Sequence, residues 1–239
     1  MNHPDQVQSA INTNGFAIIP DIYTPGVIDT LIAAISNTDT HHNTFRRSKD
    51  LFAIRQFLKE IPEVLPLIFN ERLKAVINEV FGSIYFVTKS IYFDKPETSN
   101  WYVAYHQDLT ISVDKKINTD GYSLWTVKQG QYAVQPPVEI LENNFTIRIH
   151  LDDTDEYNGA LKVIPGSHKS GILSPDRFNK HREQPTICKV PRGGIMIMKP
   201  LLLHRSGRTV NKKRRRVIHI EFSDAGLSGG LHWSEQLIL

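Results

Sequence analysis

His106 and Asp108 are the residues whose types and spacing first suggest chemistry in this chain. They stand one residue apart in the run WYVAYHQDLT, residues 101–110, which is rich in aromatic and β-branched side chains. On a β-strand, residues i and i+2 project from the same face, so the imidazole and the carboxylate would point at one spot. Together they supply two of the three ligands of a 2-His-1-carboxylate iron site. Because His-x-Asp is also common as a surface pair, a metal site can be inferred only if the rest of the chain provides the remaining ligand.

His204 is the candidate for the third ligand. It follows the glycine pair at 193–194, an apolar strand pattern and a short apolar stretch. A histidine in that setting is more often a packed or hydrogen-bonded core residue than a ligand. However, Arg215 follows eleven residues later, and an arginine fork can bind a carboxylate through two charge-assisted hydrogen bonds. A 2-oxo acid cosubstrate would offer such a carboxylate.

Two segments alternate apolar and polar residues as strands do. In 145–151 the odd positions are apolar, and the even ones, including Arg148, are polar. In 214–222 Arg215 falls on the polar face, whereas Arg216 falls on the apolar one, so the alternation favours Arg215 as the carboxylate-binding residue. A sheet with one wet face shows the same pattern. We expect helices to cover the apolar faces and the polar faces to line a cavity.

The helices and strands that would position these residues follow one another in two groups. Helical patterns occupy residues 1–14, 25–35, 51–58 and 70–82. Short strand patterns occupy residues 16–19, 84–93, 101–110, 144–152, 160–164, 187–190, 194–199 and 215–222. This order predicts an α+β fold in which a sandwich or barrel carries helices on one side.

The composition is that of a globular protein. The chain has 239 residues, of which 40% are hydrophobic, and its formal net charge is +3, which does not by itself indicate nucleic acid. One large domain over residues 1–239 is expected, with a sizeable core. The single cysteine, Cys188, excludes an internal disulfide and suits a reducing compartment. With no signal-peptide pattern at the start and no apolar run of ~18 residues, we expect a cytoplasmic protein without a membrane segment.

Within this domain, residues 1–82 are expected to be helical support, 83–224 the barrel and 225–239 a C-terminal tail. Residues 111–141 contain two glycines and a proline pair and are expected to form a long irregular excursion, which in compact domains often serves as a lid. The candidate substrate-binding residues there are Trp125, Lys128, Tyr132 and Gln135. Their aromatic and cationic character suits a small organic molecule. A structural insertion packed on the barrel rim is the alternative.

Three blocks of the sequence occur in an informative order. The first is Lys95-Pro96 followed by His-Gln-Asp at 106–108, and the second is NGALKVIPGSH at 158–168. The third is His204 with Ser206 and Arg215. With these blocks the sequence resembles the phytanoyl-CoA dioxygenase family of iron(II)- and 2-oxoglutarate-dependent oxygenases. The resemblance covers residues 16–224, and the ordered set is far more specific than any one block.

The resemblance implies a double-stranded β-helix, a jelly-roll or cupin-like barrel, with N-terminal helices packed on one sheet. It also implies that His106, Asp108 and His204 hold Fe(II), and that Arg215, with Ser206 beside it, binds the distal carboxylate of 2-oxoglutarate. Three protein ligands leave three positions for 2-oxoglutarate and O₂. The implied reaction is hydroxylation with release of succinate and CO₂. Related halogenases have a small residue in place of the carboxylate, so Asp108 argues against halogenation.

Arg148 departs from the family pattern, because many relatives carry an apolar or aromatic residue near this position. On the polar face of its strand it could bind 2-oxoglutarate, bind an acidic substrate or form an internal ion pair. The sequence favours none of the three.

Other kinds of function are compatible with parts of the sequence. The basic run 212–216 could contact nucleic acid phosphates, although one such run is more often a solvated turn. A barrel that binds metal or ligand without turnover would be a sensor or scaffold. Two histidines and an aspartate also bind zinc, as in hydrolases, but Arg215 and the order of the blocks argue against that reading. The expected partner is therefore a small-molecule substrate.

Overall fold

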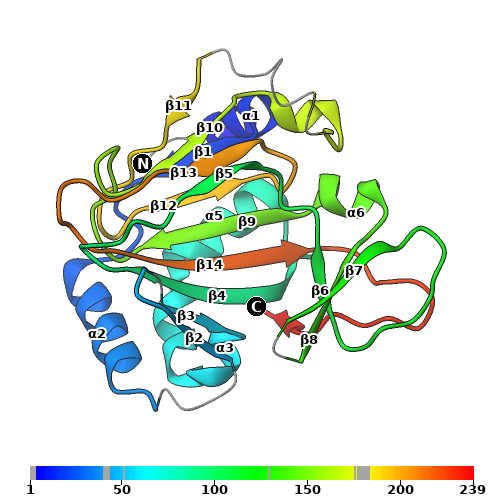
Figure 1. Ribbon diagram of the computed structural model, residues 1–239, viewed down its shortest axis with the longest axis horizontal. Helices are drawn as coiled ribbons and strands as arrows, with labels where there is room; N and C mark the ends of the chain where they lie inside the picture. Colours follow the sequence, from blue (N-terminus) through cyan, green and yellow to red (C-terminus); the bar gives the residue numbers. More distant parts are fainter. Residues whose placement is uncertain (1–3, 40–43, 51, 129, 175, 177–183) are drawn as a thin grey trace.

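The computed structural model describes residues 4–39, 44–50, 52–128, 130–174, 176 and 184–239, and of residue 128 only the backbone (Figure 1). The structural statements below concern these residues.

Helices of the first third form where the sequence caps them. The longer ones are α1 (Pro4–Asn14), α2 (Pro25–Ser36) and α5 (Glu71–Phe81). The Thr24 hydroxyl accepts from the backbone N–H of Val27, and the Asn70 side chain accepts from that of Leu73, which satisfies amide groups that a helix start leaves free. Shorter turns fill the space between them: α3 (Phe57–Glu60), η1 (Pro62–Val64) and α4 (Leu65–Ile68).

The prediction of a helix over residues 51–58 is wrong for most of that segment. Two short strands occupy this region, β2 (Phe45–Arg47) and β3 (Phe52–Arg55), and only the residues from Phe57 onward are helical. Strand β3 pairs with β4 and buries Ala53 and Ile54, so tertiary pairing decides its conformation. Residue 51 lies outside the described residues.

The large sheet is antiparallel, in the order β1-β12-β9-β14-β4-β3-β2, with β15 pairing with β4. Its remaining strands are β1 (Phe16–Ile19), β4 (Phe86–Lys95), β9 (Phe145–His150), β12 (Ile195–Met198), β14 (Arg215–Ser223) and β15 (Leu237–Ile238). The order interleaves early and late strands, so residues far apart in sequence become neighbours. Helix α5 lies behind this sheet in Figure 1.

A smaller antiparallel sheet, in the order β11-β10-β13-β5, carries His106 and His204. Its strands are β5 (Val103–His106), β10 (Leu161–Val163), β11 (Thr186–Ile187) and β13 (His204–Ser206). Strand β13 was not predicted. A 3₁₀ turn, η2 (Ser167–Ser170), follows β10.

The irregular excursion expected over 111–141 is instead mostly regular. It forms a third antiparallel sheet of β6 (Ile111–Val113), β8 (Gln131–Gln135) and β7 (Ser123–Lys128), followed by α6 (Val138–Asn143). The hairpin turns at Gly130, a residue with φ of 74°, which glycine tolerates. This sheet has its own apolar cluster, which includes Ile111, Val134 and Trp233.

The two faces of β9 separate the core from the site. Phe145, Ile147 and Ile149 belong to the apolar cluster that the helices cover, whereas Arg148 and His150 are buried on the other face. Strands that alternate in this way need an apolar layer on one side and partners for polar groups on the other. The α+β jelly roll with helices packed on one sheet is therefore confirmed.

Candidate active site

His106, Asp108 and His204 come together where strands β5 and β13 pair. His204 lies directly opposite His106 in the antiparallel register. Strand β5 ends at His106, so Asp108 does not continue the strand; its backbone N–H donates to the carbonyl of Pro200 at 2.9 Å. One ligand atom from each of the three side chains lies within 4.8 Å of the other two. The structure thus brings together the three residues that the sequence selects.

Both imidazoles are held with the same nitrogen facing the cluster. The Nδ1 of His106 is 2.8 Å from the carbonyl of Ala104, and the Nδ1 of His204 is 2.8 Å from that of Leu202. A backbone carbonyl only accepts, so Nδ1 of each ring carries a proton, and in the neutral form of the ring Nε2 is the nitrogen with the lone pair. Each Nε2 lies 3.8 Å from an oxygen of Asp108, farther than a hydrogen bond reaches. Unprotonated nitrogens and a carboxylate arranged in this way suit a shared metal ion.

The electrostatics favour the protonation states that bind metal. Burial opposes ionisation of Asp108, but the positive charge that His204, His219 and His106 can carry outweighs it and lowers the pKa of the carboxyl group to about 2. Burial lowers the pKa of His204 to about 4. At neutral pH the cluster therefore contains a carboxylate and, in His204, a neutral imidazole.

Arg215 has a buried guanidinium group with most of its donors unused. It is the first residue of β14, and its Nη2 lies 3.4 Å from the hydroxyl of Ser206. Its Nε and Nη1 have no hydrogen-bond partner in the described part of the protein. Burial, reinforced by the charge of Arg148, lowers the pKa of Arg215 to about 9. A buried cation with free donors is suited to an anionic ligand.

Arg148 is a second buried arginine on the same side of the large sheet. It lies opposite His219 in the β9–β14 register, and its Nη1 donates to the Nδ1 of that histidine at 3.0 Å. Its Nε has no hydrogen-bond partner in the described protein. Burial lowers the pKa of Arg148 to about 10; the carboxylate of Asp108 acts in the opposite direction without forming a close ion pair. Of the three roles considered for Arg148, the structure does not provide the internal ion pair.

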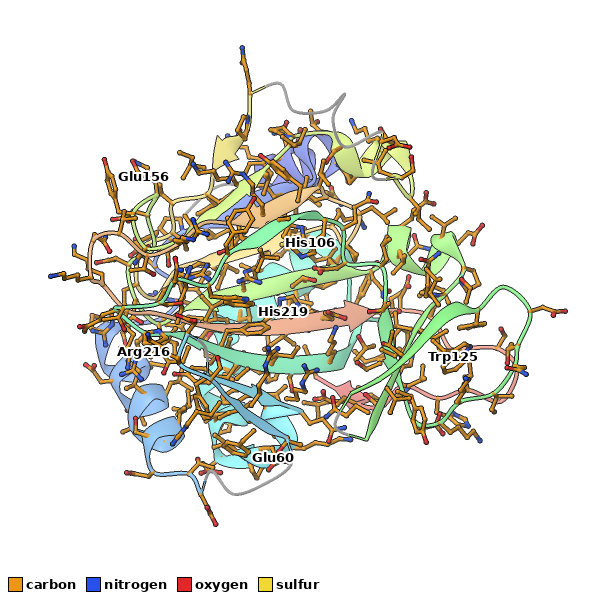
Figure 2. The ribbon with its side chains drawn as sticks, viewed as in Figure 1. Glu60, His106, Trp125, Glu156, Arg216 and His219 are labelled. Carbon is orange, nitrogen blue, oxygen red and sulfur yellow. The ribbon has the colours of Figure 1, made fainter. Side chains whose placement is uncertain are left out.

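A cavity of about 230 Å³ joins the metal-ligand cluster to both arginines. It is lined by His106, Asp108, His204, Ser206, Arg148 and Arg215, and by Phe93, Trp101, Val103, Leu161 and His219. Figure 2 shows His106 and His219 close together over the middle of the sheets. The cavity thus combines two cationic side chains, the ligand cluster and several apolar side chains.

Three candidate substrate residues of the third sheet, Trp125, Tyr132 and Gln135, do not line this cavity. Trp125 and Tyr132 pack against the separate apolar cluster around Val134. Gln135 is partly buried at the end of β8, and Trp125 lies away from the ligand cluster in Figure 2. The side chain of Lys128 lies outside the described residues.

Several cavity residues were not selected from the sequence. His219 has the same strand parity as Arg215, and this parity could have pointed to it. Trp101 belongs to the segment around His106, but its aromatic character alone gave no sign that it lines a cavity. Phe93 packs edge-on against the imidazole of His219, with ring centroids 6.1 Å apart.

The jelly roll and this site define a non-haem iron- and 2-oxoglutarate-dependent dioxygenase. The class requires a 2-His-1-carboxylate cluster with open positions beside it, and the cavity at His106, Asp108 and His204 provides both. The chain belongs to the phytanoyl-CoA dioxygenase family, whose model matches residues 11–217. No curated protein sequence matches the chain.

Solved structures of similar fold cover nearly the whole chain. AviO1 from Streptomyces viridochromogenes Tue57 is 20% identical, with a TM-score of 0.66 over 96% of this chain and 98% of its own. EctD from S. alaskensis, crystallised with 2-oxoglutarate and 5-hydroxyectoine, is 17% identical, with a TM-score of 0.71 over 93% and 77%. HygX from Streptomyces hygroscopicus, with nickel, 2-oxoglutarate and hygromycin B bound, is 16% identical, with a TM-score of 0.65 over 91% and 86%.

None of the helices in the described part of the chain combines the length and apolar character needed to cross a membrane.

Proposed function

We propose that the chain hydroxylates a small organic molecule, using Fe(II), O₂ and 2-oxoglutarate and releasing succinate and CO₂. The observation that carries the proposal is the convergence of the Nε2 atoms of His106 and His204 on the carboxylate of Asp108. When bound there, iron(II) supplies the activation of O₂, for which oxidative decarboxylation of 2-oxoglutarate provides two electrons.

The residues fit a divalent iron ion in number and in kind. Two imidazoles and one carboxylate leave three coordination positions open. The backbone carbonyls of Ala104 and Leu202 fix the two rings, which prepares the nitrogens for a ligand without rearrangement. Asp108 occupies the position that a halide would need, so the proposed outcome is hydroxylation.

Arg215 and Ser206 are proposed to bind the distal carboxylate of 2-oxoglutarate. The Nε and Nη1 of Arg215 are without partners, and the Ser206 hydroxyl lies 3.4 Å from its Nη2. In this structure the Ser206 hydroxyl donates its one hydrogen to the carbonyl of Gly159 at 3.0 Å, so to bind the carboxylate it would turn that hydrogen toward the ligand. A planar fork facing the cavity is suited to holding a carboxylate through two parallel hydrogen bonds.

The substrate class rests on the cavity and on the relatives. A cavity of about 230 Å³ lies below the usual range for drug-sized ligands, roughly 300–1,000 Å³, and suits a compact substrate. The structures of EctD and HygX contain small organic molecules, 5-hydroxyectoine and hygromycin B, together with 2-oxoglutarate.

A lid role for residues 111–141 remains a prediction. A cytoplasmic location is part of the proposal, since the one cysteine, Cys188, is a buried free thiol.

Nucleic acid binding by residues 212–216 has little structural support. Arg214 pairs with Asp94 and Arg216 pairs with Asp152, while Arg215 is buried in the cavity. Phosphate contacts need free surface cations. Three of the five basic side chains are thus engaged within the protein.

Turnover of 2-oxoglutarate tests the proposal against a catalytically silent barrel and against a zinc hydrolase. Purified protein with Fe(II), ascorbate and O₂ should convert 2-oxoglutarate to succinate, slowly without substrate. His106→Ala and Asp108→Ala should abolish succinate formation, because each removes a ligand. Succinate is measured by chromatography, and an exposed-site variant, Glu79→Gln, serves as control. Wild-type protein that fails to bind 2-oxoglutarate with metal present would overturn the proposal.

A further inference from the structure

Arg148 forms no close ion pair in the described protein, and the carboxylate that interacts with its charge is that of the metal-ligand candidate Asp108. The side chain of Arg148 is only 8% exposed, yet it lines the cavity, and its Nε has no partner. Buried arginines that serve the structure are normally paired with carboxylates, since a buried unpaired charge is costly. Arg148 therefore occupies a position that a purely structural role does not explain.

A chain of polar side chains orients this guanidinium group without cancelling its charge. Because a guanidinium group can only donate, the Nδ1 of His219 must accept from Arg148, so this imidazole is neutral and carries its proton on Nε2. That Nε2 donates to Glu221 at 3.0 Å, and Lys89 donates to the same carboxylate at 2.8 Å. Lys89 and Glu221 balance each other, and His219 links them to Arg148.

The charges expected in the loaded cavity leave Arg148 in excess. An iron(II) ion and Arg215 together carry three positive charges. The carboxylate of Asp108 and the two carboxylates of 2-oxoglutarate carry three negative charges. Nothing else that lines the cavity is acidic in the described part of the chain, so the charge of Arg148 remains available.

We propose that Arg148 binds an anionic group of the primary substrate, a carboxylate in the simplest case. The proposal rests on the proposed function, and it narrows the substrate from a small organic molecule to a small organic acid. Arg148 then acts as a specificity-determining residue, while Arg215, beside Ser206, keeps the cosubstrate. His219 is a positioning residue that fixes the orientation of the Arg148 fork.

Calorimetry with paired acids and amides tests this assignment directly. The protein is loaded with nickel(II), which prevents turnover, and with saturating 2-oxoglutarate, which blocks the cosubstrate site. The probes are acetate, benzoate and phenylacetate, each compared with its neutral amide. The variants are Arg148→Gln and Arg148→Lys, and Arg192→Gln is the control because Arg192 forms an exposed pair with Asp29.

We expect at least one acid to bind wild-type protein about 10-fold or more tightly than its amide. Arg148→Gln should weaken binding of that acid about 10- to 100-fold, Arg148→Lys should retain part of the affinity, and Arg192→Gln should change nothing. The proposal is overturned if no acid binds more tightly than its amide, or if Arg148→Gln binds the acids as wild type does.

Two further measurements separate this inference from neighbouring explanations. Arg148→Gln should weaken 2-oxoglutarate binding much less than Arg215→Gln does, because the charge of Arg148 acts on the cosubstrate only from a distance. A loss as large as that of Arg215→Gln would assign Arg148 to the cosubstrate and overturn the inference. A structural role is tested with Arg148→Met, which in the ligand-free protein should unfold at about the same temperature. The substitution removes a costly buried charge that has no close carboxylate, but it also leaves the Nδ1 of His219 without its donor. If wild-type protein binds no 2-oxoglutarate, it is the proposed function that fails.

Discussion

At the scale of single residues, the surroundings of three consecutive arginines give each a different role. Arg214, immediately before β14, donates to the carboxylate of Asp94, and Arg216, the second residue of β14, donates to that of Asp152. Arg215, between them, points into the cavity and finds no carboxylate in the described protein. Alternation along a strand thus separates two structural ion pairs from one ligand-binding cation.

Replacing Arg215 should weaken 2-oxoglutarate binding. Arg215→Gln removes the charge and most of the fork, so its dissociation constant should rise about 10- to 100-fold. Arg215→Lys should fall between wild type and Arg215→Gln, because an ammonium group keeps the charge but cannot bind a carboxylate in two parallel hydrogen bonds. Equilibrium binding to nickel-loaded protein measures both, with Arg192→Gln as control. Affinity of Arg215→Gln within 2-fold of wild type would contradict the proposed role.

The residues of the ligand cluster were predictable in identity but not in detailed position. Spacing selected His106 and Asp108, and the order of the blocks added His204. The strand argument for the pair was only partly correct, because β5 ends at His106 and Asp108 is held by its backbone bond to Pro200. His219 shows a second limit: strand parity places it on the polar face but does not say whether that face meets water or a cavity.

At the scale of elements, Gly159 lies in the turn before β10 and contacts the part of the cavity wall formed by Ser206, to which its carbonyl is hydrogen-bonded. It has a φ of 88°, and a Cβ atom placed there would lie 2.8 Å from the carbonyl oxygen of Gly207 and 2.8 Å from the Nζ of Lys95. Lys95 itself donates to that carbonyl. Both the backbone conformation and the lack of space therefore require glycine.

Gly159→Ala should lower the free energy of unfolding more than Gly82→Ala does. Gly82 has a similar φ of 91° at the end of α5, but its Cβ would meet no atom within 4 Å. With a ψ of 174°, the Gly82 backbone lies in a region that is essentially restricted to glycine, so Gly82→Ala should cost about 1–3 kcal/mol from backbone strain alone. Gly159→Ala should cost about 1–3 kcal/mol more, because the added methyl group overpacks the site. Chemical denaturation measures both variants, and equal losses would show that close approach does not matter at Gly159.

The elements that sequence reasoning missed share a physical cause. Over a segment as short as residues 52–55, the spacing of apolar residues fits a helix and a strand equally well. Pairing with β4 makes the segment a strand. Strand β13 has only three residues and exists through its partners β5 and β10. In 111–141, the proline pair and glycines suggested an irregular path, while hairpin pairing made a sheet. The long capped helices α2 and α5 were predicted because their signals are local.

At the scale of the whole molecule, the layering of the fold creates the site. Helices cover one face of the large sheet, and the small sheet stacks over the other, with Met196, Met198 and Leu202 packed between them. Polar groups at the end of this interface, such as Arg148 and Arg215, are buried without a full set of partners in the described protein. The native protein therefore holds polar groups that ligands can satisfy, and ligand binding should stabilise the fold as a whole.

Metal and 2-oxoglutarate should together raise the unfolding temperature. A ligand that binds only the folded state, present at about 100 times its dissociation constant, stabilises by about 2.7 kcal/mol. For a chain of this size that corresponds to a rise of about 5–10 °C per ligand. Differential scanning fluorimetry with nickel(II), then with nickel(II) and 2-oxoglutarate, measures the two increases in unfolding temperature, and a chelator should reverse them.

Asp108→Ala should lose both increases, because the carboxylate is a metal ligand and the metal holds the cosubstrate. Arg215→Gln should keep the increase from the metal and lose most of the second. A shift from 2-oxoglutarate that is as large without metal as with it would place the cosubstrate elsewhere than beside His106 and His204.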